Sequence, residues 1–118
     1  MALALCSQAH AANPTRGATI FGANCGVCHI AQRNASPADL ATRLGPNLWG
    51  VVGRKAGTYK GFPYSYALRS CGITWTDDQL RRYIAAPQKT VPNVRINFAG
   101  LKNPQDVEDI IAYLNTLR

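Results

Sequence analysis

The chain has 118 residues, of which 47% are hydrophobic, and its 13 Lys and Arg outweigh 6 Asp and Glu to give a formal net charge of +7. This length suits a single domain that buries only about two-thirds of its unfolded surface. No apolar run reaches the ~20 residues of a membrane-spanning helix, and no segment has the composition of disorder, so we expect a soluble globule without stable membrane insertion. The cations are scattered along the chain, which argues against nucleic acid and favours acidic partners.

The first eleven residues differ in composition from the rest. A short apolar run at 2–5 is followed by Ala-His-Ala at 9–11, which has the small-x-small form of a signal-peptidase site. We therefore expect residues 1–11 to be the remnant of a secretion signal and residues 12–118 to form the domain. An ordinary frayed N-terminus stays open as the alternative, because a positively charged start is missing.

Two helix starts lie in the first two-thirds of the domain. Asn13 before Pro14 provides an N-cap followed by a proline at the first helical position, and predicts a helix that runs into Cys25. Further along, residues 76–79 read Thr-Asp-Asp-Gln, a capping box with acidic side chains at the positive end of the helix dipole. This box predicts a second helix, which Pro87 ends.

The last helix has the strongest pattern. Asn103 and Pro104 repeat the opening signal, and an apolar i, i+3, i+4, i+7 stripe follows at Val107, Ile110, Ile111 and Leu114. A shorter helix is expected over residues 65–70. The segments 30–61 and 87–102 are rich in Gly and Pro, and strand signals are poor. The fold class is therefore mainly α: three major helices, one or two short ones, and long loops that need something besides backbone pairing to organise them.

One pentapeptide carries the chemistry of the chain. Cys25-Gly26-Val27-Cys28-His29 places two thiols three residues apart with a histidine immediately after them. This is the attachment sequence of a c-type haem, in which the thiols add to the porphyrin vinyl groups and the histidine ligates iron from one face. A thioredoxin-like redox pair would need a βαβ context, which is missing, and zinc would need a second pair of ligands. A haem wrapped by loops would also organise the long irregular segments.

Several further segments match one known family in the same order along the chain. They are Arg16-Gly17-Ala18 with Phe21, Gly45-Pro46-Asn47-Leu48-Trp49-Gly50, Gly53-Arg54-Lys55-Ala56-Gly57, Ile73-Thr74-Trp75, Tyr83, Phe98-Ala99-Gly100-Leu101-Lys102 and Ile111-Ala112-Tyr113-Leu114. On these segments the chain resembles class I cytochromes c of the mitochondrial and bacterial c2-like type over nearly all of residues 16–118. The resemblance implies a cytochrome c fold with one covalently attached haem c, in a monomeric electron carrier that is not an enzyme.

The resemblance also implies roles for four residues around the haem. The carbonyl of Pro46 would accept a hydrogen bond from His29 and fix the ring that ligates iron. Arg54 would reach toward a haem propionate and Trp75 would donate to one, since both side chains are donor-only. Tyr83 would line the distal side. Taken without the haem, Trp75 and Tyr83 would be interpreted as ordinary core residues.

Two features outside this pocket are expected to be structural. Gly17 and Phe21 should pack the first helix against Tyr113 on the last one. Cys71 is left over once the motif takes its two cysteines, and we expect it to be a small, half-buried residue on the loop before the Ile-Thr-Trp segment. A disulfide between Cys6 and Cys71 would require an uncleaved N-terminus.

The chain departs from the family at the second axial ligand. Family members place a methionine thioether on the distal face of the iron, in a segment that here spans residues 91–98. Aligned without gaps, the methionine position is occupied by Ile96, and the only methionine of the chain is Met1. Isoleucine cannot coordinate a metal, so the distal position is predicted to be altered or vacant.

Other side chains could occupy the sixth position. We expect first an open or water-bound iron, second a weak bond from Asn97, and third a neutral lysine amine from Lys89 or Lys102 after rearrangement of the loop. His10 precedes the expected cleavage point and is a doubtful ligand. Loss of a Met/His pair should lower the reduction potential and expose the iron to small ligands.

Three functions are compatible with this site. The first is a single-electron carrier of a respiratory or photosynthetic chain, which docks its basic face on acidic redox partners such as a membrane oxidase, a reductase or a reaction centre. The second is a gas-binding or sensing haem protein, and the third is a peroxidase-like enzyme at an open distal face, although no distal histidine is available for it. We expect the carrier, exported to a bacterial periplasm; a mitochondrial intermembrane space fits the expected leader less well.

Overall fold

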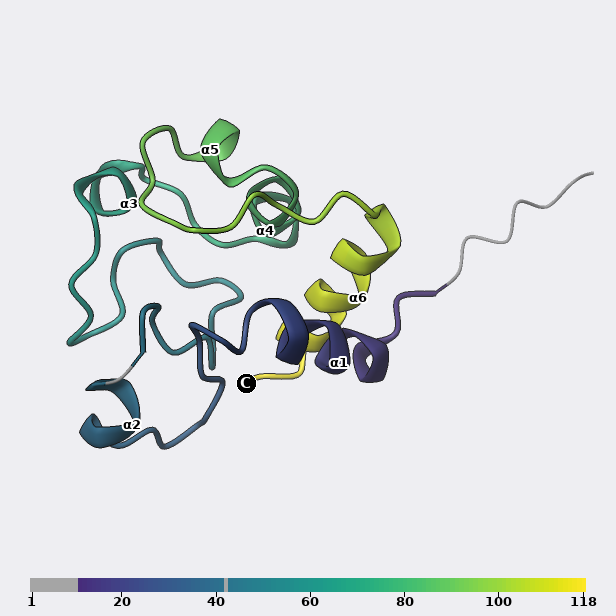
Figure 1. Cartoon of the computed structure of the whole chain (residues 1–118), viewed down its shortest axis with the longest axis horizontal. Coiled ribbons are helices and arrows are strands. Elements are labelled where there is room, and N and C mark those ends of the chain that lie inside the picture. Colours follow the sequence, from purple (N-terminus) through teal and green to yellow (C-terminus); the bar gives the residue numbers. More distant parts are fainter. Residues whose placement is uncertain (1–10, 42) are drawn as a thin grey trace, which may run out of the picture.

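The computed structural model describes residues 11–41 and 43–118, so most of the expected signal remnant lies outside the described residues. Six helices occur within this part of the chain, and Figure 1 shows their arrangement. They are α1 (Pro14–Asn24), α2 (Pro37–Ala41), α3 (Tyr66–Ser70), α4 (Asp77–Ala85), α5 (Pro87–Thr90) and α6 (Pro104–Asn115). The only β pairing among the described residues is an isolated bridge between Lys55 and Thr74.

The three longer helices begin where the sequence predicts. The Asn13 side chain accepts a hydrogen bond from the Arg16 amide at the start of α1, and α1 ends directly before Cys25. The Thr76 hydroxyl accepts from the Gln79 amide at the start of α4. Asn103 caps α6 in the same way. Each side-chain oxygen satisfies an amide that has no partner within its helix, which fixes the first residue of the helix.

The short helices divide into one that was predicted and two that were not. Ser65 caps α3, as expected for the segment 65–70. Both α2 and α5 lie in segments predicted to be irregular, so that prediction is wrong there. In α2, Ser36 and Asp39 bond reciprocally through backbone and side chain, which is a capping box in one turn of helix. In α5, Pro87 is the first helical residue and not only the end of the preceding helix.

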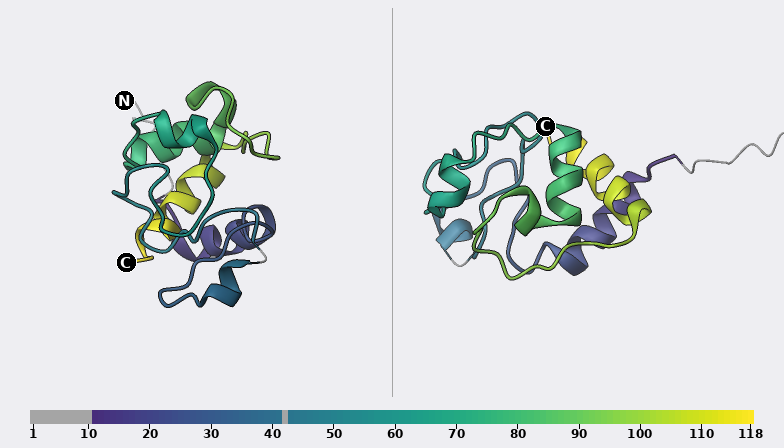
Figure 2. Two further views of the ribbon diagram at one scale, coloured as in Figure 1. Left: turned by 90° about the vertical axis from the view of Figure 1, so that its left-hand side faces the viewer. Right: turned by 90° about the horizontal axis from the view of Figure 1, so that it is seen from above.

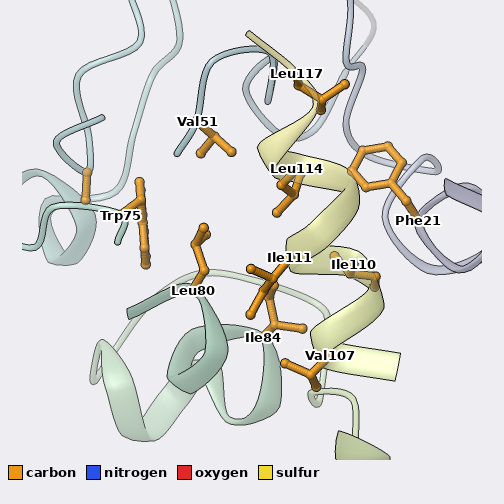
Figure 3. Close-up of a cluster of buried hydrophobic side chains, with 11 residues drawn as sticks. Phe21, Val51, Trp75, Leu80, Ile84, Val107, Ile110, Ile111, Leu114 and Leu117 are labelled. Atoms are coloured by element: carbon orange, nitrogen blue, oxygen red, sulfur yellow. The ribbon is translucent and has the colours of Figure 1, made fainter. Parts of the chain in front are cut away.

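One hydrophobic core joins α4 and α6 to the loops. Figure 3 shows Leu80 and Ile84 of α4 directed toward the apolar stripe of α6, with Trp75 and Val51 approaching from the loops. Ile110, at the centre of this stripe, is completely buried. The i, i+3, i+4, i+7 pattern of the last helix therefore forms the main wall of the core.

The first and last helices cross at close range. Gly17 lies against the backbone of α6, where a Cβ atom would come within 1.9 Å of the Asp109 carbonyl oxygen. Beside it, the rings of Phe21 and Tyr113 meet edge to face with their centroids 5.2 Å apart. The predicted contact of Gly17 and Phe21 with Tyr113 is thus confirmed, and it holds the two ends of the domain together.

The rest of the molecule consists largely of loops. Figures 1 and 2 show α1 and α6 at one end, and α2, α3 and the long connecting segments at the other. In the described residues, α2 and α3 pack against no other helix, whereas α6 contacts both α1 and α4. None of the helices within residues 11–41 and 43–118 has the length and apolar character that a membrane crossing requires.

Candidate haem-binding site

The attachment motif forms a tight turn at the end of α1. The Cys25 amide donates to the Phe21 carbonyl as the last helical bond, at 2.7 Å. The amides of Cys28 and His29 then both donate to the Cys25 carbonyl, at 3.1 and 2.9 Å. This turn keeps the two thiols and the imidazole in one short segment, and all three side chains are half-buried.

The imidazole of His29 is held from a second segment. Its Nδ1 lies 2.7 Å from the Pro46 carbonyl oxygen, so the neutral ring donates from Nδ1 and leaves Nε2 with a free lone pair. Gly45 provides the space for this contact, because a Cβ atom there would come within 2.4 Å of the His29 ring. The Gly45 amide also donates to the Cys28 carbonyl, at 3.0 Å. The predicted bond between His29 and Pro46 is therefore present.

Burial favours the neutral forms of His29 and Cys25. It lowers the pKa of His29 below its ordinary value, an effect that the hydrogen bond to Pro46 opposes and the nearby charge of Arg54 reinforces. Burial likewise raises the pKa of Cys25 to about 11. A neutral, half-buried thiol does not fit a low-pKa redox pair or a thiolate metal site. Among the described residues, no three His, Cys, Asp or Glu side chains converge as a zinc site would require.

Arg54 is a half-buried cation with only neutral partners. Its guanidinium donates to the carbonyls of Asn47, at 3.0 Å, and Trp49, at 3.4 Å, and lies 5.0 Å from the centre of the Tyr59 ring. Burial lowers the pKa of Arg54. No carboxylate of residues 11–41 or 43–118 forms an ion pair with it. A buried cation without a counter-ion fits a pocket that receives a carboxylate, such as a haem propionate.

Sequence reasoning assigned no role to the residue that organises this pocket. Asn47 is 2% exposed. Its amide group accepts from the backbone of Gln32 and Trp49 and donates to the Gln32 carbonyl and the Tyr59 hydroxyl. Asn47 stands within the Gly-Pro-Asn segment that carries the family resemblance, so the signal for it was present. Two of its partners, Gln32 and Tyr59, lie 15 and 12 residues away on other loops, and sequence spacing does not reveal them.

Tyr64 is a second residue that sequence reasoning missed. Its hydroxyl accepts a hydrogen bond from the Tyr59 amide at 3.0 Å, and burial raises its pKa. The hydroxyl thus stays protonated and retains a hydrogen to donate. Together with Arg54 and Asn47, it makes this end of the pocket rich in donors.

Trp75 and Tyr83, which the resemblance assigns to a haem propionate and to the distal side, lie together. Trp75 is buried, and its ring centroid is 4.9 Å from that of Tyr83. Burial raises the pKa of Tyr83 to about 12, so its phenol is neutral at any physiological pH. These two residues fit an apolar wall that offers N–H and O–H donors to a cofactor.

The segment expected on the distal face lies between α5 and α6. Ile96 is half-buried and Asn97 is exposed. Buried Val91 and Val94 anchor the segment, and the Gln88 side chain donates to the Val94 carbonyl at 2.8 Å. These contacts attach the loop to α5 and bury two of its side chains.

The lysine and histidine candidates for the sixth iron position lie outside this loop, and so does Cys71. Lys89 and Lys102 are both exposed, and Lys102 donates from Nζ to the carbonyls of Ala85 and Ala99, at 3.3 and 3.2 Å. His10 lies outside the described residues, as does Cys6. Cys71 is half-buried at the end of α3, where its thiol donates to the Leu68 carbonyl, in agreement with the expectation of a small structural residue.

Comparisons with known proteins agree with this geometry. The sequence profile of the family described as Cytochrome c matches residues 14–118. The chain belongs to the cytochrome c family. It is similar to cytochrome c2 of Rhodopila globiformis, with 43% identity over 90% of this chain and 94% of the relative. It is also similar to cytochrome c of Chlamydomonas reinhardtii, with 39% identity over 92% of each chain.

A solved structure supports the fold directly. Cytochrome cH from Methylobacterium extorquens is 38% identical and superposes with a TM-score of 0.76, covering 88% of this chain and 98% of that one. The cytochrome c fold and the mainly α class are therefore confirmed. The chain is a c-type haem protein that carries one covalently attached haem c and transfers electrons between redox partners. The gas-sensing and peroxidase-like alternatives receive no support from these relatives.

Proposed function

We propose that the haem of this carrier is attached through Cys25 and Cys28, with His29 as the proximal iron ligand. The observation that carries this proposal is the 2.7 Å contact between His29 Nδ1 and the Pro46 carbonyl, because it leaves Nε2 free for iron and fixes the plane of the ring. When bound, the haem supplies an iron centre that accepts and releases one electron. The chain's residues bind it, orient His29 and exclude water.

We propose that Arg54 and Trp75 receive the haem carboxylates and that Tyr83 lines the distal side. Half-buried Arg54 supports this role because its partners are neutral carbonyls, and the buried indole of Trp75 supports it as a donor-only group. Such donors let charged propionates lie inside a domain that would otherwise pay a large desolvation cost for them.

We further propose that the carrier works without a thioether on the distal face. Support comes from Ile96 at the methionine position of the family and from a chain whose only methionine is Met1. The bond from Gln88 to the Val94 carbonyl and the buried Val91 and Val94 side chains support a loop that keeps its shape without a bond to iron. An open or water-bound position is our first choice for the sixth ligand.

The three protein ligands ranked in the sequence analysis are weaker choices. Asn97 is exposed, so its side chain would have to leave solvent to reach the metal. Lys102 would have to break two hydrogen bonds to carbonyls and lose a proton, while Lys89 would have to leave solvent and lose a proton. We therefore rank Asn97 second and lysine third.

The visible absorption spectra of the ferric and ferrous protein, with and without carbon monoxide, test this proposal. We expect a high-spin ferric spectrum, no sulfur-to-iron charge-transfer band at the red end of the visible range, and a shift of the ferrous spectrum on addition of carbon monoxide. A charge-transfer band, or a ferrous form that ignores carbon monoxide, would contradict an open distal position.

The variant Ile96→Met completes the test. A thioether at this position should give a low-spin spectrum and raise the reduction potential, because a Met/His pair favours the reduced iron. Ile96→Leu, which adds no ligand atom, is the matched control and should leave both properties near those of the parent. If the methionine variant behaves like the leucine variant, residue 96 does not face the iron.

We propose that the partners are acidic redox proteins, such as a membrane oxidase, a reductase or a reaction centre, and that the carrier works in the periplasm as a monomer. The net charge of +7 supports acidic partners, and the signal-peptidase pattern at residues 9–11 supports export. Fractionation of cells that make the full chain tests the location: the haem-stained protein should leave with the periplasmic contents. Retention with the cytoplasm would refute export.

A further inference from the structure

The carbonyl that holds the His29 ring belongs to the peptide unit between Pro46 and Asn47. A peptide unit is planar, so the Pro46 oxygen and the Asn47 amide turn together. Proline fixes its own φ angle, which leaves the ψ angle of Pro46 and the φ angle of Asn47 to orient this unit. Any contact that holds Asn47 therefore also decides how well the oxygen points at His29 Nδ1, 2.7 Å away.

The Asn47 side chain is held by four hydrogen bonds. Its Oδ1 accepts from the amides of Trp49, at 3.0 Å, and Gln32, at 3.2 Å. Its Nδ2 donates to the Gln32 carbonyl, at 2.7 Å, and to the Tyr59 hydroxyl, at 3.3 Å. The bond to the amide two residues on closes an Asx turn directly after Pro46. Because the side chain is 2% exposed, water does not compete for these bonds.

The two bonds between Asn47 and Gln32 join the iron-ligand segment to the segment that carries its acceptor. Gln32 lies three residues after His29. Two backbone hydrogen bonds, at 3.0 and 2.9 Å, also link residues 28–30 to residues 45–48. The backbone bonds can persist when a side chain is changed, whereas the bonds of the Asn47 amide group cannot. Asn47 is therefore the part of this junction that a substitution can remove.

We propose that Asn47 is a positioning residue of the iron site, which acts through the Pro46 carbonyl to set how strongly His29 binds iron and so to set the reduction potential of the carrier. A carbonyl held against Nδ1–H makes the imidazole a stronger donor at Nε2. A stronger donor stabilises ferric iron and keeps the reduction potential low. The inference rests on the proposed function only for the role of His29 as the proximal ligand.

The test compares Asn47→Ala with Asn47→Ser in the holoprotein. Alanine removes all four bonds, whereas the serine hydroxyl can still close the turn on the Trp49 amide but is too short to replace the bonds to Gln32. We expect both variants to have a higher reduction potential than the parent, with the larger shift in Asn47→Ala. A parent-like potential in Asn47→Ala would overturn the proposal. If that variant does not fold, a parent-like potential in Asn47→Ser overturns it.

A second measurement follows the hydrogen on His29 Nδ1 by NMR in a low-spin ferrous form, with carbon monoxide bound where the iron accepts it. Its exchange with solvent should be about tenfold faster in Asn47→Ala, because the bond to Pro46 weakens, and should increase less in Asn47→Ser. Unchanged exchange would overturn the proposal. Ring signals typical of an iron-bound histidine in the parent test the proposed function separately, since their absence would mean that His29 is not the ligand.

The control Val107→Ala separates positioning from a general loss of stability. Val107 is buried near the start of α6, and Figure 3 shows it at the opposite side of the core from Val51, which follows the Pro46 segment. Its truncation should lower stability, because buried apolar contacts are lost, but should leave the potential and the His29 exchange rate unchanged. Equal shifts in Val107→Ala and Asn47→Ala would mean that any loosening of the fold changes the iron site, and would overturn the proposal.

Discussion

Single residues decide how the loops of this molecule are joined, and Asn47 is the clearest case. One buried amide group takes hydrogen bonds from two backbone amides and gives them to a carbonyl and a phenol. It joins its own segment to Gln32 and Tyr59, 15 and 12 residues away, and none of these segments has regular structure of its own. When a buried backbone group loses such a partner, the folded state loses much more free energy than when an exposed group does. The reason is that water does not replace the lost hydrogen bond.

The variant Asn47→Ala should therefore lower the free energy of unfolding by about 3 kcal/mol, since it leaves the Gln32 and Trp49 amides without an acceptor. Denaturant unfolding of the holoprotein measures this loss. The matched control is Asn24→Ala on the exposed side of α1, where one surface bond to the Ile20 carbonyl is removed and the change should stay within about 0.5 kcal/mol. Similar losses in both variants would refute the role of Asn47 as a buried junction.

The sequence predicts some functional residues of the haem site and not others, for a physical reason. His29 and Pro46 could be assigned because a known family places them in a recognisable order, and the 2.7 Å contact agrees with the assignment. Asn47 and Tyr64 received no role, because their functions depend on which loops meet in space. The sixth iron ligand stays a prediction, because the haem iron itself selects the group that binds there.

At the scale of elements, the three longer helices and the short α3 were predictable, whereas the one-turn helices α2 and α5 were not. Asn13, Thr76 and Asn103 mark their helix starts by side-chain oxygens, which are readable in sequence. Ser36 and Asp39 carry the same signal for α2, but the turn lies in a Gly- and Pro-rich segment and has no apolar stripe. Periodicity needs several turns to be visible, so a helix of one turn escapes it.

The crossing of α1 and α6 depends on one missing side chain. Gly17→Ala would place a Cβ atom 1.9 Å from the Asp109 carbonyl, against rigid backbone, so the helices must move apart. We expect a loss of about 2–3 kcal/mol in the free energy of unfolding, as overpacked cores show. Gly22→Ala on the same helix meets nothing within 4 Å and should gain up to about 1 kcal/mol from helix propensity. Thermal unfolding of both variants measures the contrast, and a neutral Gly17→Ala would show that the crossing can relax.

The same crossing should respond to acid. Fully buried Asp109 accepts from the Asn13 amide, from Arg16 and from Gln105, at 2.8, 2.7 and 2.8 Å, and these bonds lower its pKa. A carboxyl whose pKa is lower in the folded state than in the unfolded state stabilises the fold at any pH above its ordinary pKa. This contribution disappears as the pH falls through the pKa of the folded state. Stability should therefore fall below about pH 4.

Asp109→Asn is the variant that isolates this effect. It keeps the shape of the side chain but removes its charge, so the free energy of unfolding should be lower at neutral pH and should depend less on pH in the acidic range. Asp78→Asn, which replaces an exposed carboxylate in the first turn of α4, serves as the control and should follow the parent closely. The measurement is the free energy of chemical unfolding as a function of pH. If Asp109→Asn loses stability with falling pH as steeply as the parent does, the acid sensitivity belongs to other groups.

At the scale of the whole molecule, helix packing explains only one end of the structure. Contacts between helices join α6 to α1 and α4, and α4 to α5, whereas α2 and α3 pack against no other helix in the described part of the chain. Residues 43–65 and 91–103 lie between these elements without regular pairing beyond a single bridge. A small domain with loops of this length requires another component to complete its core. The covalent haem is that component.

The double variant Cys25→Ser/Cys28→Ser, which cannot attach the haem, should therefore lose the cooperative thermal transition of the holoprotein. Binding to the folded state alone stabilises that state, and removal of a large bound group withdraws both this stabilisation and the apolar surface on which the loops lie. Circular dichroism and hydrogen exchange measure the loss, and protection should disappear first in residues 43–65 and 91–103. Cys71→Ser is the control, because its thiol bonds only the Leu68 carbonyl, and it should keep the haem and the transition. A cooperative transition that survives without the haem would mean that the contacts among α1, α4 and α6 stabilise the fold by themselves, and that the loops are ordered by Asn47 and its partners alone.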